Sequence, residues 1–337
     1  MRACALGRKV GYSGLRPLEP ARDLGQVVAL LEGAFGEEVG REGRQALKEL
    51  RFWARLSPLI WLLDRFEGAG SHFLEGFVWV EGGRVVGNVN ISEVDWGRWV
   101  ISNLVVASPY RRRGIGRRLM EAAIDLACQQ GGEMVILRVR ADNEVALNLY
   151  HSLGFEEVSA TTEMRLTPRR LSTLASHLPS LPTEGFTLRP IHRDEWEKEY
   201  ELALTTTSIK AQQLEPPQKS DFRIGLSQML KDLLAGRREY RLAVEREGEF
   251  VATLTVRATR FLGEHSLRMM VHPNHRGRLE EMLITRALSI LAKYPRRSVT
   301  IKHPADHQEA IQALRKHGFH EERTLVKMKL ELELLHN

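Results

Sequence analysis

The chain has 337 residues, of which 43% are hydrophobic, 27% charged and 7% aromatic, and its formal net charge is +6 at pH 7. That length exceeds what one ordinary domain needs, so two domains of roughly 150 residues are expected, each with its own core. The positive charge suits an anionic ligand, whereas the low aromatic content and the lack of a mixed basic and aromatic stretch argue against nucleic acid as a partner.

Cysteine usage and apolar runs bear on the compartment. Cys4 and Cys128 are too few and too far apart in sequence to indicate a disulfide framework or a metal site. No apolar segment is long enough for a signal peptide or a membrane span. These observations predict a cytoplasmic protein that uses no metal and has no membrane partner.

The first third of the chain mixes helical and strand-like patterns. Residues 14–18 are typical of a strand, and residues 21–35 and 41–56 are typical of amphipathic helices. Gly82-Gly83 lies between two apolar runs and predicts a hairpin over 76–94, which a strand over 99–106 follows. Glu93 and Asp95 stand where the hairpin ends.

A basic turn follows that strand and predicts an anion site. Pro109 ends the apolar run Leu104, Val105 and Val106, and a helix with an apolar face begins at Ile115. Gly114 and Gly116 let the backbone approach a ligand closely, and the first N–H groups of the helix are unpaired. Charge suited to pyrophosphate comes from five arginines between residues 111 and 118: Arg111, Arg112, Arg113, Arg117 and Arg118.

A second motif lies downstream, after a predicted strand over 134–139. Asn143 stands at the start of a helix whose apolar positions include Tyr150, and Gly154 follows where a helix would end. Taken alone, Asn143 could be only a helix cap and Tyr150 only a core aromatic residue.

Together the two motifs resemble the signatures of the GNAT-type N-acetyltransferase superfamily, Arg-x-x-Gly-x-Gly after a strand and then Asn-x-x-Ala-x-x-x-Tyr-x-x-x-Gly-Phe. The resemblance implies acetyl transfer from acetyl-CoA, as cosubstrate, to a primary amine of a small molecule or peptide. It implies that the turn over 111–117 holds the pyrophosphate, that Leu104 to Val106 and Asn143 hold the pantetheine arm, and that Tyr150 protonates the departing thiolate. Some family members carry a glutamate base where this chain has Arg138, so Glu93 and Asp95 are the candidate bases here, acting directly or through water.

The second half repeats the first. Residues 167–185 contain three prolines and are typical of a linker, and the segment from Pro304 then aligns with the segment from Arg140. We therefore predict an acetyl-CoA-binding domain over 1–166, a linker over 167–185 and a related domain over 186–337. The expected fold class is mixed α/β: two tandem GNAT-like domains, each a mostly antiparallel mixed sheet flanked by helices, with a splayed central strand pair.

The two copies are chemically unequal. Leu279 replaces Gly116, His307 replaces Asn143 and Leu314 replaces Tyr150. A side chain where backbone must approach pyrophosphate argues against CoA binding there, and the expected proton donor is missing. The histidines of this half match no zinc spacing.

Alternative functions stay open at this point. The chain could bind acyl-CoA without catalysis, or it could be a nucleic-acid- or ribosome-associated protein of GNAT ancestry. Its tandem layout also resembles that of mycothiol synthase, which implies a small aminosugar thiol as acceptor. The expected use of the second half is to close the acceptor side of the first half or to form a homodimer contact.

Overall fold

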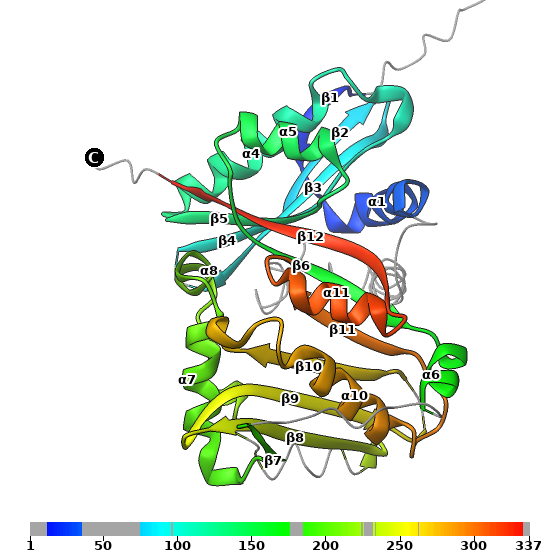
Figure 1. Ribbon diagram of the computed structural model, residues 1–337. Helices are drawn as coiled ribbons and strands as arrows, with labels where there is room; N and C mark the ends of the chain where they lie inside the picture. Colours follow the sequence, from blue (N-terminus) through cyan, green and yellow to red (C-terminus); the bar gives the residue numbers. More distant parts are fainter. Residues whose placement is uncertain are drawn as a thin grey trace, which may run out of the picture. The chain divides into compact units, whose positions relative to one another are not determined.

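The computed structural model describes residues 12–35, 75–95, 97–175, 185–223, 225, 232, 234–261 and 263–332 (Figure 1). The helix predicted over 41–56 lies outside these residues. The chain forms two compact units, one made of Met1–Arg138, Asn148–Glu156 and Met328–Asn337, the other of Val139–Leu147 and Glu157–Lys327. Strands and flanking helices occur in both units, which confirms the predicted mixed α/β class.

The first unit is built on the strand order β1-β2-β3-β4-β5, with the end of β12 beyond β5. Strands β1 to β4 pair in antiparallel fashion, whereas β4 and β5 are parallel. In chain order the unit contains β1 (Gly14–Pro17), α1 (Pro20–Phe35), β2 (Gly76–Glu81), β3 (Arg84–Asp95), β4 (Arg98–Val106), the short helix η2 (Ser108–Tyr110), α4 (Ile115–Gln129), most of β5 (Met134–Arg140) and the end of α5 (Glu144–Ser152).

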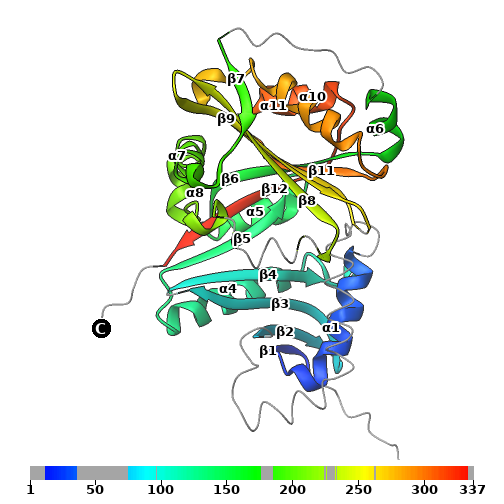
Figure 2. The ribbon, with the colours of Figure 1, turned by 90° about the horizontal axis from the view of Figure 1, so that it is seen from below.

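Two helices contact the strands of this unit. The predicted apolar face of α4 is confirmed, since Ile115, Leu119 and Ala123 are buried and the helix contacts β2, β3 and β4. Gly87 makes the approach possible, because a Cβ there would lie 3.0 Å from a methyl group of Leu119. Helix α1 lies beside β3 and β4 (Figure 2) and packs Val27 and Leu31 against valines of β2, β3 and β4.

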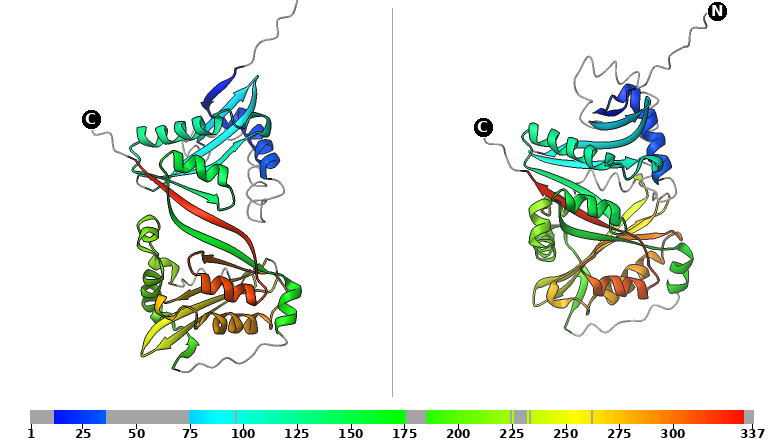
Figure 3. Two further views of the ribbon diagram at one scale, coloured as in Figure 1. Left: turned by 45° about the horizontal axis from the view of Figure 1, so that its top comes forward. Right: turned by 90° about the horizontal axis from the view of Figure 1, so that it is seen from above.

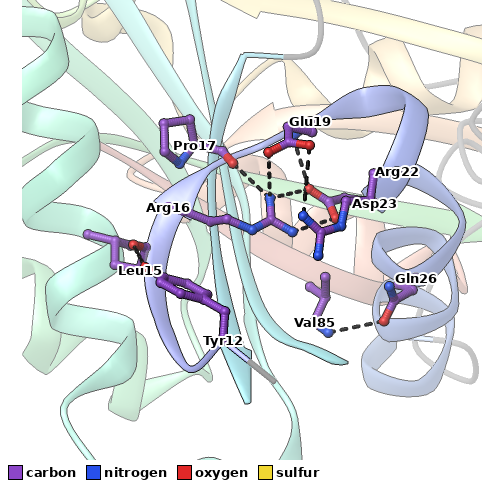
Figure 4. A network of polar contacts seen from close by, with 9 residues as sticks. All are labelled: Tyr12, Leu15, Arg16, Pro17, Glu19, Arg22, Asp23, Gln26 and Val85. Atoms are coloured by element: carbon purple, nitrogen blue, oxygen red, sulfur yellow. Dashed lines mark hydrogen bonds and ion pairs between the residues drawn. The ribbon is translucent and has the colours of Figure 1, made fainter. Parts of the chain in front are cut away.

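An arginine–carboxylate pair ties the first strand to the first helix. Arg16 donates to both carboxylate oxygens of Asp23, at 2.6 and 2.7 Å, and Asp23 is fully buried (Figure 4). Asp23 also accepts the backbone N–H of Glu19 at 2.9 Å. The second copy repeats the device: Arg189 lies in its first strand and donates to both oxygens of Glu195 at 2.8 and 2.6 Å. The repeated Leu-Arg-Pro sequence therefore marks a repeated structural joint.

The second unit has the strand order β12-β6-β11-β10-β9-β8-β7. The pairs β6–β11, β9–β10, β8–β9 and β7–β8 are antiparallel, whereas β10 and β11 are parallel. Its elements are β6 (Glu156–Leu166), α6 (Pro168–Ala175), β7 (Thr187–Pro190), η3 (Arg193–Glu195), α7 (Trp196–Thr206), α8 (Ile209–Leu214), η4 (Lys219–Asp221), β8 (Arg237–Arg246), β9 (Glu249–Thr259), β10 (His265–Val271), η5 (Pro273–His275), α10 (Glu280–Leu291), β11 (Val299–Pro304), α11 (Gln308–Lys316) and β12 (His320–Glu331).

Alternation along β8 divides the core of this unit between two faces. Leu242 and Val244 belong to the large cluster that includes the apolar side of α10, whereas Ala243 packs with Leu202 of α7. Successive side chains of a strand point to opposite faces, so α7 and α10 cover opposite sides of the sheet. Figure 1 shows α10 and α11 in front of β9, β10 and β11.

The last strand of each copy pairs, wholly or in part, within the unit formed by the other copy. β6 follows the second motif of the first copy, yet it pairs with β11 in the second unit. β12 lies beside β6 (Figure 3), where Thr162 and Thr324 share a hydrogen bond of 3.0 Å. The end of β12 belongs to the first unit, where Leu332 donates its N–H to the carbonyl of Glu133 at 2.9 Å. The compact units thus follow strand pairing, whereas the predicted division at residue 166 follows the sequence repeat.

Candidate functional site

The central strands of the first unit separate at one end. β4 pairs with β5 from Arg98 to Val100, opposite Met134 to Ile136, and within the described residues this pairing goes no further. Beyond that point the backbone from Leu104 to Val106 has strand β3 on one side only. Strand pairing thus leaves one edge of β4 open to an extended, amide-bearing ligand. The predicted splayed strand pair is therefore present.

A β-bulge lies at the same place. Asn88 of β3 stands opposite Val105 and Asn90 stands opposite Ser102, so β4 carries one extra residue, and Asn103 there has φ of 54°. A bulge re-aims the backbone groups next to it. The second copy has no such feature along the described pairing of β9 with β10, which keeps a regular register from Arg257 to Ala252.

Three asparagine amides brace the bulge. Asn88 donates through Nδ2 to the carbonyl oxygen of Asn103 at 3.1 Å and to Oδ1 of Asn90 at 2.9 Å, and Asn103 also donates to Oδ1 of Asn90 at 3.2 Å. Asn88 is fully buried and its Oδ1 has no partner within the described residues. No prediction from the sequence included this cluster, although two asparagines two residues apart in an apolar strand were a usable signal.

The glycine-containing turn leads from β4 into α4. Gly114 caps the helix in the left-handed conformation, with φ of 74°, and no side chain caps the start of the helix. A Cβ on Gly114 would meet nothing within 4 Å, so the approach to this turn is open. Arg111 and Arg113 fold back onto the turn and donate to the carbonyls of Val106 at 3.0 Å and Pro109 at 3.2 Å. Open amides, a helix N-terminus and arginines together make an anion-binding arrangement.

The other residues of the turn have individual surroundings. Ile115 is buried in the core, and a Cβ on Gly116 would lie within 4 Å of Val106 and Leu149. Arg112 has φ of 61°. Arg117 donates to the hydroxyl of Ser152 on α5 and lies 3.5 Å from Glu121.

Helix α5 carries the two candidates from the second motif. Asn143 caps this helix, and its Oδ1 accepts the N–H of Ala146 at 3.2 Å. Tyr150 is 7% exposed and packs against Phe155, with 5.9 Å between ring centroids. Burial raises the pKa of the Tyr150 phenol to about 12. The phenol is therefore fully protonated at neutral pH. Its hydroxyl makes no hydrogen bond to the described part of the chain, so the proton is available to a ligand.

The two candidate bases lie near the end of β3, opposite the first residues of β4. Glu93 stands opposite Trp99, four positions before Asn103, which corresponds to ~13 Å along a strand. Glu93 accepts the N–H of Gly97 at 3.4 Å. Asp95 forms an ion pair with Arg98, whose hydrogen bond lowers the pKa of that carboxyl group. Neither carboxylate lies at the bulge.

In the second copy, the corresponding turn is filled by a side chain of its own. Glu280 accepts the N–H of Gly277 at 2.9 Å and that of Leu279 at 3.0 Å. Burial opposes ionisation of Glu280, but hydrogen bonds from His307 and from backbone N–H groups lower its pKa below the ordinary value. The carboxylate therefore holds the place that an anionic ligand would take.

A buried chain of hydrogen bonds keeps Glu280 in position. His307 lies 2.8 Å from Glu280, and His303 lies 2.9 Å from His307. All three residues are at most 2% exposed. Burial and the neighbouring His307 lower the pKa of His303 to about 3, so that ring is neutral. Leu279, which precedes Glu280 in the sequence, is also buried, at 2% exposed.

Metal-binding and membrane-spanning features are missing from the parts of the chain that the structure describes. These residues hold no group of three or more His, Cys, Asp or Glu side chains that could bind a metal ion. No helix within the described ranges is long and apolar enough to cross a membrane.

Comparison with known proteins gives a family match over part of the chain. Residues 37–155 match the model of the acetyltransferase (GNAT) family. The N-alpha-acetyltransferase RimI of Mycobacterium tuberculosis is 43% identical over 82 residues, which are 23% of this chain and 49% of that protein. The [ribosomal protein bS18]-alanine N-acetyltransferase of Escherichia coli K12 is 39% identical over 69 residues, 20% of this chain and 47% of that protein. The chain thus spans about half the length of these curated relatives.

Solved structures extend the likeness to the whole fold. A tandem GNAT protein from the clavulanic acid biosynthesis pathway is 21% identical, with a TM-score of 0.52 over 95% of this chain and 98% of that one. A GCN5-related N-acetyltransferase from Sphaerobacter thermophilus is 18% identical, with a TM-score of 0.57 over 94% and 95% of the two chains. At these identities the likeness shows a shared fold.

Proposed function

We propose that this chain, whose N-terminal half carries a domain of the acetyltransferase (GNAT) family, transfers an acetyl group from acetyl-CoA to a primary amine. The observation that carries the proposal is that, among the described residues, the first copy alone combines an open glycine turn with an end of β4 that carries a bulge and pairs with one neighbouring strand. The chain would hold one acetyl-CoA, in its first copy.

The residues fit the donor by chemical type. The open amides after Gly114, with Arg111, Arg112, Arg113 and Arg117, would hold the pyrophosphate, and the free edge at Leu104 to Val106 would bind the pantetheine amides. Asn143 would supply a further amide contact. Acetyl-CoA supplies an activated thioester. The side chains and backbone of the first copy would bind it, orient it and transfer the protons.

Two proton movements accompany the transfer. Tyr150 keeps its proton through the neutral range and would give it to the departing thiolate, an uphill step because a thiol has a pKa of ~8.5. The acceptor amine must lose a proton in turn. Glu93 and Asp95 stay the proposed acceptors of that proton, through water, and Glu93 is the better one because Asp95 is engaged by Arg98.

The asparagine cluster would determine where the amine sits. Nδ2 of the buried Asn88 holds the carbonyl of the bulge, and Oδ1 of Asn90 accepts from both neighbouring amides, so the cluster would fix the backbone beside the acceptor. One relative is an N-alpha-acetyltransferase by name, and another is by name an alanine N-acetyltransferase of a ribosomal protein, so the α-amine of a peptide is the first acceptor class to test.

Calorimetric titration with acetyl-CoA tests the donor site. We expect one site per chain, lost in Gly114→Glu because a carboxylate would enter the phosphate approach. Gly277→Glu alters the equivalent position of the second copy, which also has positive φ, and is the matched control that should leave affinity unchanged. Two equal sites per chain, or loss of binding in the control alone, would contradict the proposal.

A further inference from the structure

A hollow of about 1190 Å³ lies in the second unit. It is at the opposite end of β9 from the turn whose N–H groups Glu280 occupies, which is called the sealed turn below. The start of β9 adjoins the turn, where the backbone N–H of His272 donates to the carbonyl of Val251. Arg257 near the end of β9, and Arg260 and Phe261 just beyond it, line the hollow. Its other walls are residues 190–193 after β7, residues 220, 221, 223 and 232, and residues 236–242 at the start of β8. Its size is beyond that of a pocket for one small ligand.

Arginine dominates the lining of this hollow. Seven arginines line it against three carboxylates: Arg193, Arg223, Arg237, Arg238, Arg241, Arg257 and Arg260 against Asp221, Asp232 and Glu239. Arg241 pairs with Glu199, and Arg257 pairs with Glu239. The lining retains an excess of positive charge even when every one of these carboxylates is paired, which favours an anionic ligand.

Three other arginines lie over aromatic rings. The guanidinium of Arg223 is 4.1 Å from the ring centroid of Trp196, that of Arg238 is 5.1 Å from Tyr240, and that of Arg260 is 5.8 Å from Tyr294. A guanidinium stacked on a ring is oriented by it and keeps its N–H donors for phosphate or carboxylate oxygens. The three guanidinium groups are therefore already oriented to donate hydrogen bonds to an anionic ligand.

An exposed aromatic ring completes the hollow. Phe261 is 65% exposed, although one side of its ring lies against Gly236. A Cβ on Gly236 would come within 2.3 Å of that ring, and the residue has φ of 63°, so only glycine fits beneath it. A large apolar ring held in place and open to solvent offers a face on which a base can stack.

We propose that this arginine hollow binds the phosphate groups of a single-stranded nucleic acid, with a base stacked on Phe261. Arginines alone would also suit an acidic peptide, but the ring beside them matches the combination of basic groove and stacking platform that single strands use. No contiguous stretch of sequence predicts this surface, because its walls come from segments that only the fold brings together. The inference does not depend on acetyl transfer, since it concerns the copy whose cofactor turn is sealed.

Binding to the full chain can be measured by fluorescence anisotropy with a labelled single-stranded RNA of about 12 nucleotides, between about 50 and 200 mM salt. We expect saturable, salt-dependent binding that Arg238→Glu and Arg260→Glu each weaken by about tenfold or more, with a shallower salt dependence. Arg170→Glu and Arg315→Glu reverse exposed charges on α6 and α11, outside the lining of the hollow, and should change the affinity less than about twofold.

A second comparison distinguishes a nucleic acid from a free phosphorylated ligand as the source of the phosphate. Phe261→Ala should weaken RNA binding by about tenfold, as expected for one lost base stack, and leave the binding of inorganic tripolyphosphate unchanged. Absence of saturable RNA binding, equal losses in the control variants, or polyglutamate competing as well as RNA would each overturn the proposal. RNA binding that is insensitive to Phe261→Ala would overturn the nucleic-acid assignment in favour of a free phosphorylated ligand.

Discussion

At the scale of single residues, Tyr150 combines burial with a hydroxyl that the described fold leaves without a hydrogen bond. If it donates the proton that the thiolate needs, Tyr150→Phe should lower kcat by about 100-fold. Acetyl-CoA affinity should stay unchanged, because the ring of the variant can still pack against Phe155. Steady-state kinetics with a peptide amine, beside calorimetry with acetyl-CoA, measure both quantities. Full activity in the variant would make Tyr150 a packing residue.

The same phenol makes stability depend on pH in the alkaline range. Below pH ~10 it is neutral in both the folded and the unfolded chain and contributes no pH dependence. Between pH ~10 and the folded pKa of about 12, only the unfolded chain loses the proton, so the free energy of unfolding falls, by about 3 kcal/mol at most. Urea unfolding at about pH 9 and about pH 11 should show this fall in the native chain and a smaller one in Tyr150→Phe. Equal falls in both proteins would contradict the assignment.

At the scale of elements, the joint between β1 and α1 rests on one buried ion pair. Removing one partner leaves the other charge without compensation, so Asp23→Ala should lower the free energy of unfolding by about 3 to 5 kcal/mol. Lys316→Ala breaks the exposed pair with Glu281 and should cost less than about 1 kcal/mol. Chemical denaturation of the two variants measures the contrast, and equal costs would show that the joint does not depend on the pair of Arg16 with Asp23.

Elements with local signals were predictable from the sequence. The hairpin at Gly82-Gly83, the helix after Gly114 and the strand before Pro109 each follow from a few adjacent residues, and the structure confirms them. Residues 156–166 form the single strand β6, whose partner β11 lies far along the chain, so its pairing could not be read from adjacent residues. The bulge at Asn103 and the arginine hollow depend on pairings between distant segments, which local patterns do not encode.

At the scale of the whole molecule, the first unit depends on the final residues of β12. Met328 is fully buried, and Leu332 bonds to Glu133. A variant truncated after Lys327 should therefore lose several kcal/mol of stability in its first unit, since removing one such buried side chain costs about 2 to 5 kcal/mol. Scanning calorimetry should show that the first unit unfolds at a lower temperature, and titration calorimetry should show weaker acetyl-CoA binding. Met328→Ala in the full-length chain is the milder companion variant, and an unchanged first transition in both would contradict this role for β12.

The placement of β12 also has a consequence for synthesis. Residues 133 and 332 must meet, although roughly two hundred residues separate them, and contacts of such long range form late. During translation, the first copy emerges early but stays without its closing strand until residues 328–332 have left the ribosome. Arrested nascent chains that lack these residues should bind acetyl-CoA more weakly than released chains. The copy that is made first is thus completed last.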